Sequence, residues 1–206
     1  MSASPDGRSG PGPAEMADPS SWIARTIAAD PRAMAQLAAV RELGLPDWCI
    51  AAGFVRNLVW EALHGHAPRR EPNDVDVLFF DPRDTGRGRE AAVQARLVRS
   101  MPDTVWEVRN QARMHVAKGL PPHRDTAHAM TFWLETPTAV GVRLGDDGAL
   151  AIVAPFGVGD LVGLVCRPTP WGAVRRAEYD ARMAGKRWRE TWPKLRFEEP
   201  RPEAAG

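Results

Sequence analysis

Asn73-Asp74-Val75-Asp76-Val77-Leu78-Phe79-Phe80 is the stretch from which the fold can be worked out. Alternation of polar and apolar residues is typical of a strand, whose side chains point to opposite faces in turn. Asp74 and Asp76 therefore share one face of a predicted strand, with their Cα atoms roughly 7 Å apart. Val75, Val77 and Phe79 lie on the other face.

The two aspartates of this strand stand among large apolar residues. Two anions in such a place repel each other and lose hydration, so they need a compensating cation. Mg²⁺ prefers hard carboxylate oxygens and meets that need. Taken alone, the spacing favours two solvated aspartates on an edge strand, and the surrounding sequence changes that balance.

A glycine turn lies about twenty residues upstream, in Ala52-Gly53-Phe54-Val55-Arg56-Asn57. The apolar run 47–52 before it predicts a short strand, and the spacing of apolar residues over 55–63 predicts a helix. Gly53 would allow backbone N–H groups to approach a phosphate, and the N-terminus of the helix adds partial positive charge. A glycine needed only for tight packing is the alternative.

The remaining chain alternates between helical and strand patterns, which argues for a mixed sheet flanked by helices. Apolar spacing predicts helices over 20–43, with a break at Asp30-Pro31, and over 87–100, 111–118, 156–164 and 171–188. Strands are predicted over 104–108, 139–144 and 150–154, the last two joined by the turn Gly145-Asp146-Asp147-Gly148. The fold class is therefore α/β (α+β).

These motifs resemble the nucleotidyltransferases of the DNA polymerase β superfamily, and more closely a bacterial nucleotidyltransferase-like family within it. The segment 52–57 is similar to the glycine signature of that superfamily, and 73–77 to its paired metal-ligand aspartates. The similarity continues through 106–115, Glu135-Thr136, 139–144, 154–157 and Asp160-Leu161. In two places the chain departs from the pattern: Ala52 stands where the superfamily often has Gly, and Asn57 where it often has Asp.

The resemblance implies a polymerase β-like fold, an NTP substrate and Mg²⁺ or Mn²⁺ held by Asp74 and Asp76. It also implies a third carboxylate on a neighbouring strand, for which Glu107 is our candidate metal ligand and catalytic residue, with Glu135 in reserve. A salt bridge from Glu107 to Arg109 or Arg113 is the structural alternative. Gly53, Arg56 and Asn57 are predicted to bind the phosphates.

The predicted reaction is transfer of a nucleoside monophosphate from an NTP to an unidentified hydroxyl acceptor. A catalytically silent nucleotide-binding or partner-binding module on the same fold is the alternative, favoured by Ala52 and Asn57. Metal-dependent phosphoester hydrolysis is weaker, because the clustered histidines usual in such enzymes are missing from the motifs. A helix that packs its tryptophans on the body is favoured over RNA binding for the basic and aromatic residues near the C-terminus, which are Lys186, Arg187, Trp188, Arg189, Trp192, Lys194 and Arg196.

The overall composition fits a globular protein, with 206 residues, a net charge of +1 and two widely spaced cysteines. We expect a disordered tail over 1–19, a nucleotidyltransferase-like domain over 20–190 and a C-terminal extension over 191–206. No apolar run is long enough for a membrane span and no secretory signal is present, so the expected location is the cytoplasm. The oligomeric state is left open.

Overall fold

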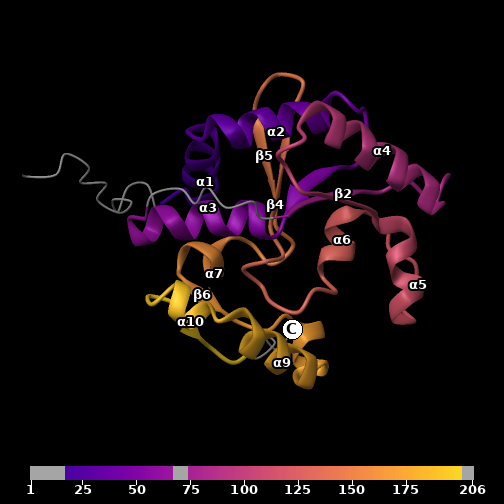
Figure 1. Ribbon diagram of the computed structural model, residues 1–206. Coiled ribbons are helices and arrows are strands. Elements are labelled where there is room, and N and C mark those ends of the chain that lie inside the picture. The colour runs from indigo at the N-terminus through magenta and orange to yellow at the C-terminus, as the bar shows by residue number, and fades with distance from the viewer. Residues whose placement is uncertain (1–16, 67–73, 201–206) are drawn as a thin grey trace, which may run out of the picture.

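A computed structural model describes residues 17–66 and 74–200 (Figure 1). The predicted tail up to residue 16, Asn73 of the motif and the last six residues of the predicted extension lie outside the described residues. The N-terminal half contains, in order, α1 (Pro19–Ala28), α2 (Pro31–Arg41), β1 (Cys49–Ala51), α3 (Gly53–His64), β2 (Val75–Phe79) and α4 (Arg87–Ser100).

The C-terminal half starts with β3 (Trp106–Asn110), the 3₁₀ turn η1 (Gln111–Arg113), α5 (Met114–Lys118) and α6 (Thr126–Met130). The hairpin β4 (Gly141–Leu144) and β5 (Leu150–Val153) and the short α7 (Gly159–Val162) follow. The chain closes with β6 (Val165–Cys166), α8 (Pro170–Val174), α9 (Arg176–Lys186), α10 (Trp188–Thr191) and β7 (Arg196–Phe197).

The strands of the described chain form a five-stranded mixed sheet in the order β3-β2-β1-β4-β5. The predicted mixed sheet flanked by helices is thereby confirmed. Parallel pairing joins β2 to β3 through the crossover helix α4, whereas β1 is antiparallel to both β2 and β4. Asp76 consequently lies on an interior strand, directly beside the strand that carries Glu107.

The two faces of the sheet are packed differently. Val75, Val77 and Phe79 point into the main core, which also contains residues of α1, α2, α3 and α4. Figure 1 shows α2 and α4 above the sheet and α9 and α10 on the far side of the molecule. The opposite face, which carries Asp76 and Leu78, has a smaller apolar cluster built from Cys49, Ala51, Leu78, Met130 and Ala139. Asp76 on this face is half-buried, so it keeps access to solvent.

Helices α1 and α2 begin where the sequence provides capping residues. Asp18 and Asp30 accept hydrogen bonds from the first backbone N–H groups of α1 and α2, and a proline stands at each helix start.

Helix α1 begins at Pro19, so the structured domain starts one residue inside the predicted tail. The strand predicted over 104–108 is shifted by two residues, and the helices predicted over 156–164 and 171–188 are shorter or interrupted.

The C-terminal segment differs from the predicted extension. Trp192 and Leu195 are buried in the main core, and β7 pairs in parallel with β6. Trp188 and Trp192 pack edge-on against Trp60 of α3, with ring centroids 5.2 and 5.8 Å away. Residues 191–197 therefore belong to the domain, because burying these aromatic rings against α3 stabilises the docked arrangement.

Candidate active site

Three carboxylates stand near one end of the β2–β3 pair, and we call Asp74, Asp76 and Glu107 the carboxylate edge. Asp76 and Glu107 are register partners on adjacent parallel strands, so their side chains stand on the same face. Asp74 immediately precedes β2 and is exposed, whereas Asp76 and Glu107 are half-buried. The strand with Asp76 and the strand with Glu107 are separate in the sequence. The crossover through α4 brings them side by side in the sheet.

The electrostatics of the carboxylate edge are those of crowded anions. Burial, followed by the neighbouring Glu107 and Asp74, raises the pKa of Asp76 to about 6, against smaller lowering effects of Arg56 and Arg109. The ionised carboxylate is thus less favourable here than in water, and an added cation would stabilise it. The chemistry of these donors therefore fits a divalent cation with a preference for hard oxygen ligands.

Glu107 already has a partner, Arg109, two residues along β3 on the same face. The Arg109 guanidinium donates a hydrogen bond to the Glu107 carboxylate, and the two side chains are 38% and 40% exposed. Among the described residues, no set of three or more His, Cys, Asp or Glu side chains is gathered closely enough to hold a metal ion. For Glu107 to bind a metal ion, its carboxylate would therefore have to release the Arg109 guanidinium.

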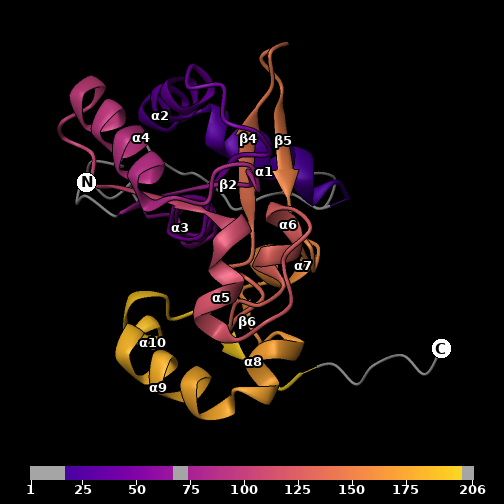
Figure 2. The same ribbon diagram turned by 90° about the vertical axis from the view of Figure 1, so that its right-hand side faces the viewer.

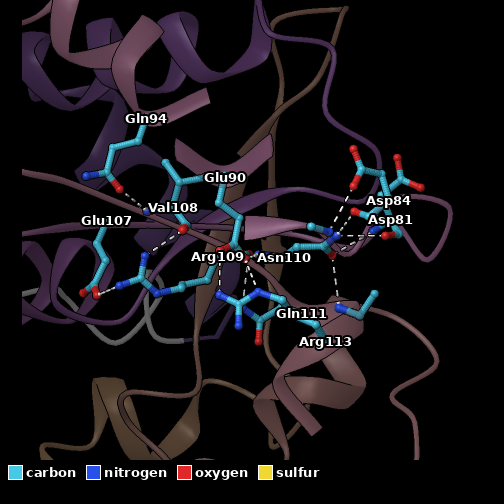
Figure 3. A network of polar contacts seen from close by, with 12 residues as sticks. Asp81, Asp84, Glu90, Gln94, Glu107, Val108, Arg109, Asn110, Gln111 and Arg113 are labelled. Carbon is cyan, nitrogen blue, oxygen red and sulfur yellow. Dashed lines mark hydrogen bonds and ion pairs between the residues drawn. The ribbon is translucent and has the colours of Figure 1, made fainter. Parts of the chain in front are cut away.

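Side chains of α4 and the following turn hold β3 in place (Figure 3). Gln94 accepts a hydrogen bond from the Val108 backbone N–H at 3.3 Å, and Glu90 accepts from the Asn110 backbone N–H at 2.6 Å. Arg113 closes the network with an ion pair to Glu90. The outward N–H groups of this edge strand are thus satisfied by α4, which fixes the strand that carries Glu107.

This network gives a structural role to the polar group Arg109, Asn110, Gln111 and Arg113. Asn110 is 1% exposed and donates to the backbone carbonyls of Asp81 and Asp84, both at 2.8 Å. Figure 3 shows Asn110 near Asp81 and Asp84 of the loop after β2, whereas Arg113 is directed at Glu90 and Arg109 at Glu107. Glu90, which sequence analysis did not single out, is the buried centre of the network. Nothing in the helical pattern of 87–100 distinguishes it from a solvated glutamate.

The start of α3 forms the second part of the site. No side chain of the described protein caps its first turn, and its N-cap residue Ala52 has φ 57° and ψ −122°. A Cβ built on Gly53 would lie 3.6 Å from Arg56 Nη2 and 3.7 Å from Asn57 Nδ2. The predicted residues Gly53, Arg56 and Asn57 are therefore gathered at one helix N-terminus, where donors and the helix dipole favour an anion.

Arg56 is far more buried than a phosphate-binding arginine at a cleft surface would need to be. Its side chain is 6% exposed, and its Nη1 and Nη2 donate to Thr138 Oγ1 at 2.8 Å and Asn57 Oδ1 at 3.1 Å. The guanidinium lies 4.5 Å from the Trp188 ring centroid. Burial lowers its pKa to about 10, opposed by Glu135. Nε is buried without a partner among the described residues, so the group keeps one uncommitted donor.

Glu135, the reserve candidate for the third carboxylate, stands elsewhere. It is 1% exposed, and both of its oxygens accept hydrogen bonds from Arg182 Nε of α9, at 2.8 and 3.0 Å. Its register bridge is to Pro168, outside the five-stranded sheet. The geometry thus places Glu107, and not Glu135, beside Asp76.

Comparison with known proteins agrees with this geometry. A family model described as a nucleotidyltransferase matches residues 38–197. The chain belongs to this nucleotidyltransferase family. Within it, the protein is an enzyme of the nucleotidyl-transfer class on a polymerase β-like fold. No curated protein sequence matches the chain.

Solved structures extend the comparison. An NMR structure described as a CCA-adding enzyme head domain is 32% identical, with a TM-score of 0.77 over 86% of this chain and 95% of that one. A complex of a CCA-adding enzyme with CTP is 15% identical, with a TM-score of 0.57 over 86% of this chain. A tRNA-processing enzyme complex is 18% identical, with a TM-score of 0.51 over 81% of this chain. The chain spans 43% of each of these last two, which show the fold alone.

The helices of the described chain are all too short or too polar to cross a membrane. Cys49 and Cys166 are both buried and unpaired, as expected for Cys49 from its apolar run.

Proposed function

We propose that this nucleotidyltransferase moves a nucleoside monophosphate from an NTP to a hydroxyl group and releases pyrophosphate, in a reaction that requires a divalent cation. The observation that carries the proposal is the direct register of Asp76 with Glu107, with Asp74 just before β2, on the face of the sheet opposite the main core. The likeness to a CCA-adding head domain supports the same reaction class.

Asp74, Asp76 and Glu107 are the residues that would hold Mg²⁺ or Mn²⁺. When bound, the cation would offset the charge on the transferring phosphate and lower the pKa of the attacking hydroxyl. The three carboxylates keep this end of the sheet anionic, and the raised pKa of Asp76 makes added positive charge favourable. Arg109 would leave Glu107 as the site fills, and its guanidinium would then be free for an anionic group of the substrate.

The phosphates of the NTP would lie at the N-terminus of α3. Gly53 supplies a backbone N–H without a side chain in the way, and Asn57 Nδ2 and the adjacent Arg56 guanidinium add donors. Arg56 also positions this turn, since it ties α3 to Thr138 and to Trp188. We expect the nucleotide to be held between this helix end and the carboxylate edge.

The acceptor hydroxyl belongs to a small molecule, an RNA end or a protein side chain. The solved relatives include proteins described as tRNA-processing enzymes, which makes an RNA 3′ end the first acceptor to test. Two buried, unpaired cysteines are consistent with a reducing compartment such as the cytoplasm.

A nucleotide-binding protein without catalysis is the second candidate. The ion pair of Glu107 with Arg109 and the strained backbone at Ala52 favour it. In that case Arg109 would remain on Glu107, and an NTP would bind without being cleaved.

The test is incubation with each α-labelled NTP and Mg²⁺ or Mn²⁺, in the presence of tRNA, a pool of small hydroxyl compounds, or no added acceptor. Wild type should transfer label and release pyrophosphate. Asp76→Asn and Glu107→Gln should each lower the rate by about 10²–10³-fold or more, as removal of a preorganised charge-stabilising group does. Asp146→Asn, in the exposed β4–β5 turn, is the matched control and should leave the rate unchanged.

Metal-dependent NTP binding by wild type without any transfer would support the silent alternative and reject the enzymatic proposal. Equal rates in wild type and Asp76→Asn would show that transfer takes place elsewhere.

A further inference from the structure

Helix α9 presents an arginine that is only partly used by the protein. Arg182 directs its Nε at both oxygens of the buried Glu135. Its two Nη groups make no hydrogen bond to any residue that the structure describes. Its side chain is 35% exposed, so it spans the distance from a buried carboxylate to the surface. A guanidinium anchored through one nitrogen has a fixed orientation, with four N–H bonds left for an outside partner.

Lys186 lies one helical turn further along α9, on the same face as Arg182. It is exposed, and in the described part of the chain it has no hydrogen bond or ion pair. Partial burial and the cations Arg182 and Arg56 lower its pKa, against raising effects of Glu135 and Asp74. Lys186 thus extends the cations on this face of α9 beyond Arg182.

Arg182 borders a cavity of about 210 Å³. It is lined by Lys118, Phe132, Trp133, Leu134, Glu135, Thr138 and Arg182. Thr138 accepts a hydrogen bond from Arg56 at 2.8 Å, so the cavity borders the part of the site at the start of α3. Trp188, just after α9, stacks on the same arginine. Figure 2 shows α9 with α8 and α10 at the end of the molecule away from α2 and α4.

We define Arg56, Arg182 and Lys186, gathered around Glu135, as the cationic cluster. Three cations and one carboxylate leave a formal excess of two positive charges. Unpaired cations at a partly buried site are unfavourable without an anionic partner. The nearby carboxylates Asp74 and Asp76 have the opposite need, because they require positive charge.

We propose that Arg182 and Lys186 bind the triphosphate of the NTP, so that α9 forms the wall of the nucleotide site opposite the carboxylate edge. This rests on the proposed function, since it assigns the phosphate-binding residues of the same site. A triphosphate matches both features of α9: its oxygens accept the paired Nη donors of Arg182, and its charge complements the excess of the cationic cluster. A nucleobase is uncharged, so a base in the aromatic-lined cavity would pair neither with the Lys186 ammonium nor with the excess positive charge of the cationic cluster.

The experiment measures binding of tripolyphosphate and of each NTP by calorimetry with Mg²⁺, in wild type and in variants of α9. Lys186→Gln should weaken tripolyphosphate binding about tenfold or more, the size of one lost hydrogen bond to a charged group. Arg182→Lys keeps a cation for Glu135 but loses the Nη groups, and should weaken binding similarly. Arg96→Gln on α4, which removes an exposed cation away from the site, should leave the dissociation constant unchanged.

The loss of binding affinity in the α9 variants should also depend on the number of phosphates, and should be larger for an NTP than for the matching monophosphate. Unchanged melting temperatures of the variants would show that the fold is kept.

Three outcomes would overturn the inference. Unchanged tripolyphosphate binding in both α9 variants, with Asp76→Asn still defective, would leave the proposed function standing and remove α9 from the phosphate site. Altered preference among the four NTPs with unchanged tripolyphosphate binding would assign the cavity to the base. Wild type that binds neither NTP nor tripolyphosphate would reject the proposed function together with this inference.

Discussion

The carboxylate edge and the cationic cluster solve opposite electrostatic problems. The edge places Asp76 and Glu107 on neighbouring strands with Asp74 just before β2, and within residues 17–66 and 74–200 only Glu107 of the three has an ion-pair partner, at a half-exposed position. The cluster surrounds one buried carboxylate with cations drawn from α3 and α9. The edge therefore depends on an added ligand for its charge balance, whereas the cluster helps to hold the fold and still presents spare donors. Charge that looks similar in sequence can thus serve ligand binding in one place and stability in another.

The sharpest contrast is between the two glutamates. Glu135→Gln should lower the free energy of unfolding by about 2–4 kcal/mol, because it leaves Arg182 and Arg56 without their buried counterion. This is below the full cost of breaking a buried pair, since Arg182 is partly exposed. Glu107→Gln should change stability by under about 1 kcal/mol, as for exposed ion pairs. Urea denaturation of both variants measures the difference.

The order of the two variants should be reversed for activity: Glu107→Gln, the more stable variant, should be the less active one. Glu107→Gln, although stable, should lose metal-dependent nucleotidyl transfer. Glu135→Gln should lose less of it at temperatures where it stays folded, because Glu135 orients Arg182 and is not one of the proposed metal ligands. If both glutamates cost the same stability, the distinction between a ligand site and a structural site would be wrong.

The pKa of Asp76 gives a smaller effect with a definite sign. The folded-state pKa is about 6, raised from 3.8, so the native protein binds more protons than the unfolded chain between these values. The stabilisation from the protonated form is fully present below the unfolded pKa and is lost as the pH rises through about 6. Without divalent metal, wild type should therefore lose stability across this window.

Asp76→Asn should flatten this part of the pH profile. At pH 7.5 in chelator it should be more stable than wild type by about 1–2 kcal/mol, a value reduced for solvent screening from the roughly 1.4 kcal/mol per pKa unit. Added Mg²⁺ should stabilise wild type and not the variant. Thermal melts at pH 4.5 and 7.5 give the result, and a variant that is less stable than wild type at both would contradict the crowding of anions.

The smallest expected change in stability is at Ala52, in the turn between β1 and α3. Its positive φ belongs to backbone conformations that favour glycine, and holding an alanine there costs on the order of 1–3 kcal/mol. Ala52→Gly relieves that strain but adds roughly 0.5–1 kcal/mol of unfolded-chain entropy. We expect a net stabilisation of about 1 kcal/mol by urea denaturation. Gly44→Ala, at φ 60° in an exposed turn, is the reverse control and should destabilise.

Local patterns allowed the carboxylate edge to be predicted. The alternation over 73–80 requires a strand, and it separates Asp74 and Asp76 from the face that carries Val75 and Val77. The glycine before a helical pattern likewise predicts a helix N-terminus at Gly53. Each of these inferences uses residues within about ten positions of one another, and side-chain periodicity is fixed over that range.

The cationic cluster could not be predicted in this way. Arg56, Glu135 and Arg182 lie far apart in the chain, and none has a neighbour that reveals its partner. Lys186 and Trp188 were interpreted as part of a helix that packs its tryptophans, and the packing of Trp188 on α3 agrees with that interpretation. Their position near the site follows only from where the helix docks.

The sequence by itself determined the strand with its paired aspartates, the glycine turn and the family to which they point. It did so because local side-chain periodicity and turn chemistry depend on neighbouring residues. Tertiary structure alone decided that Glu107 lies beside Asp76 while Glu135 pairs with Arg182. The register of β3 on β2 and the docking of α10 on α3 are set by the packing of the whole core, including Trp60 with Trp188 and Trp192. Such long-range packing leaves no pattern in any single stretch of the chain.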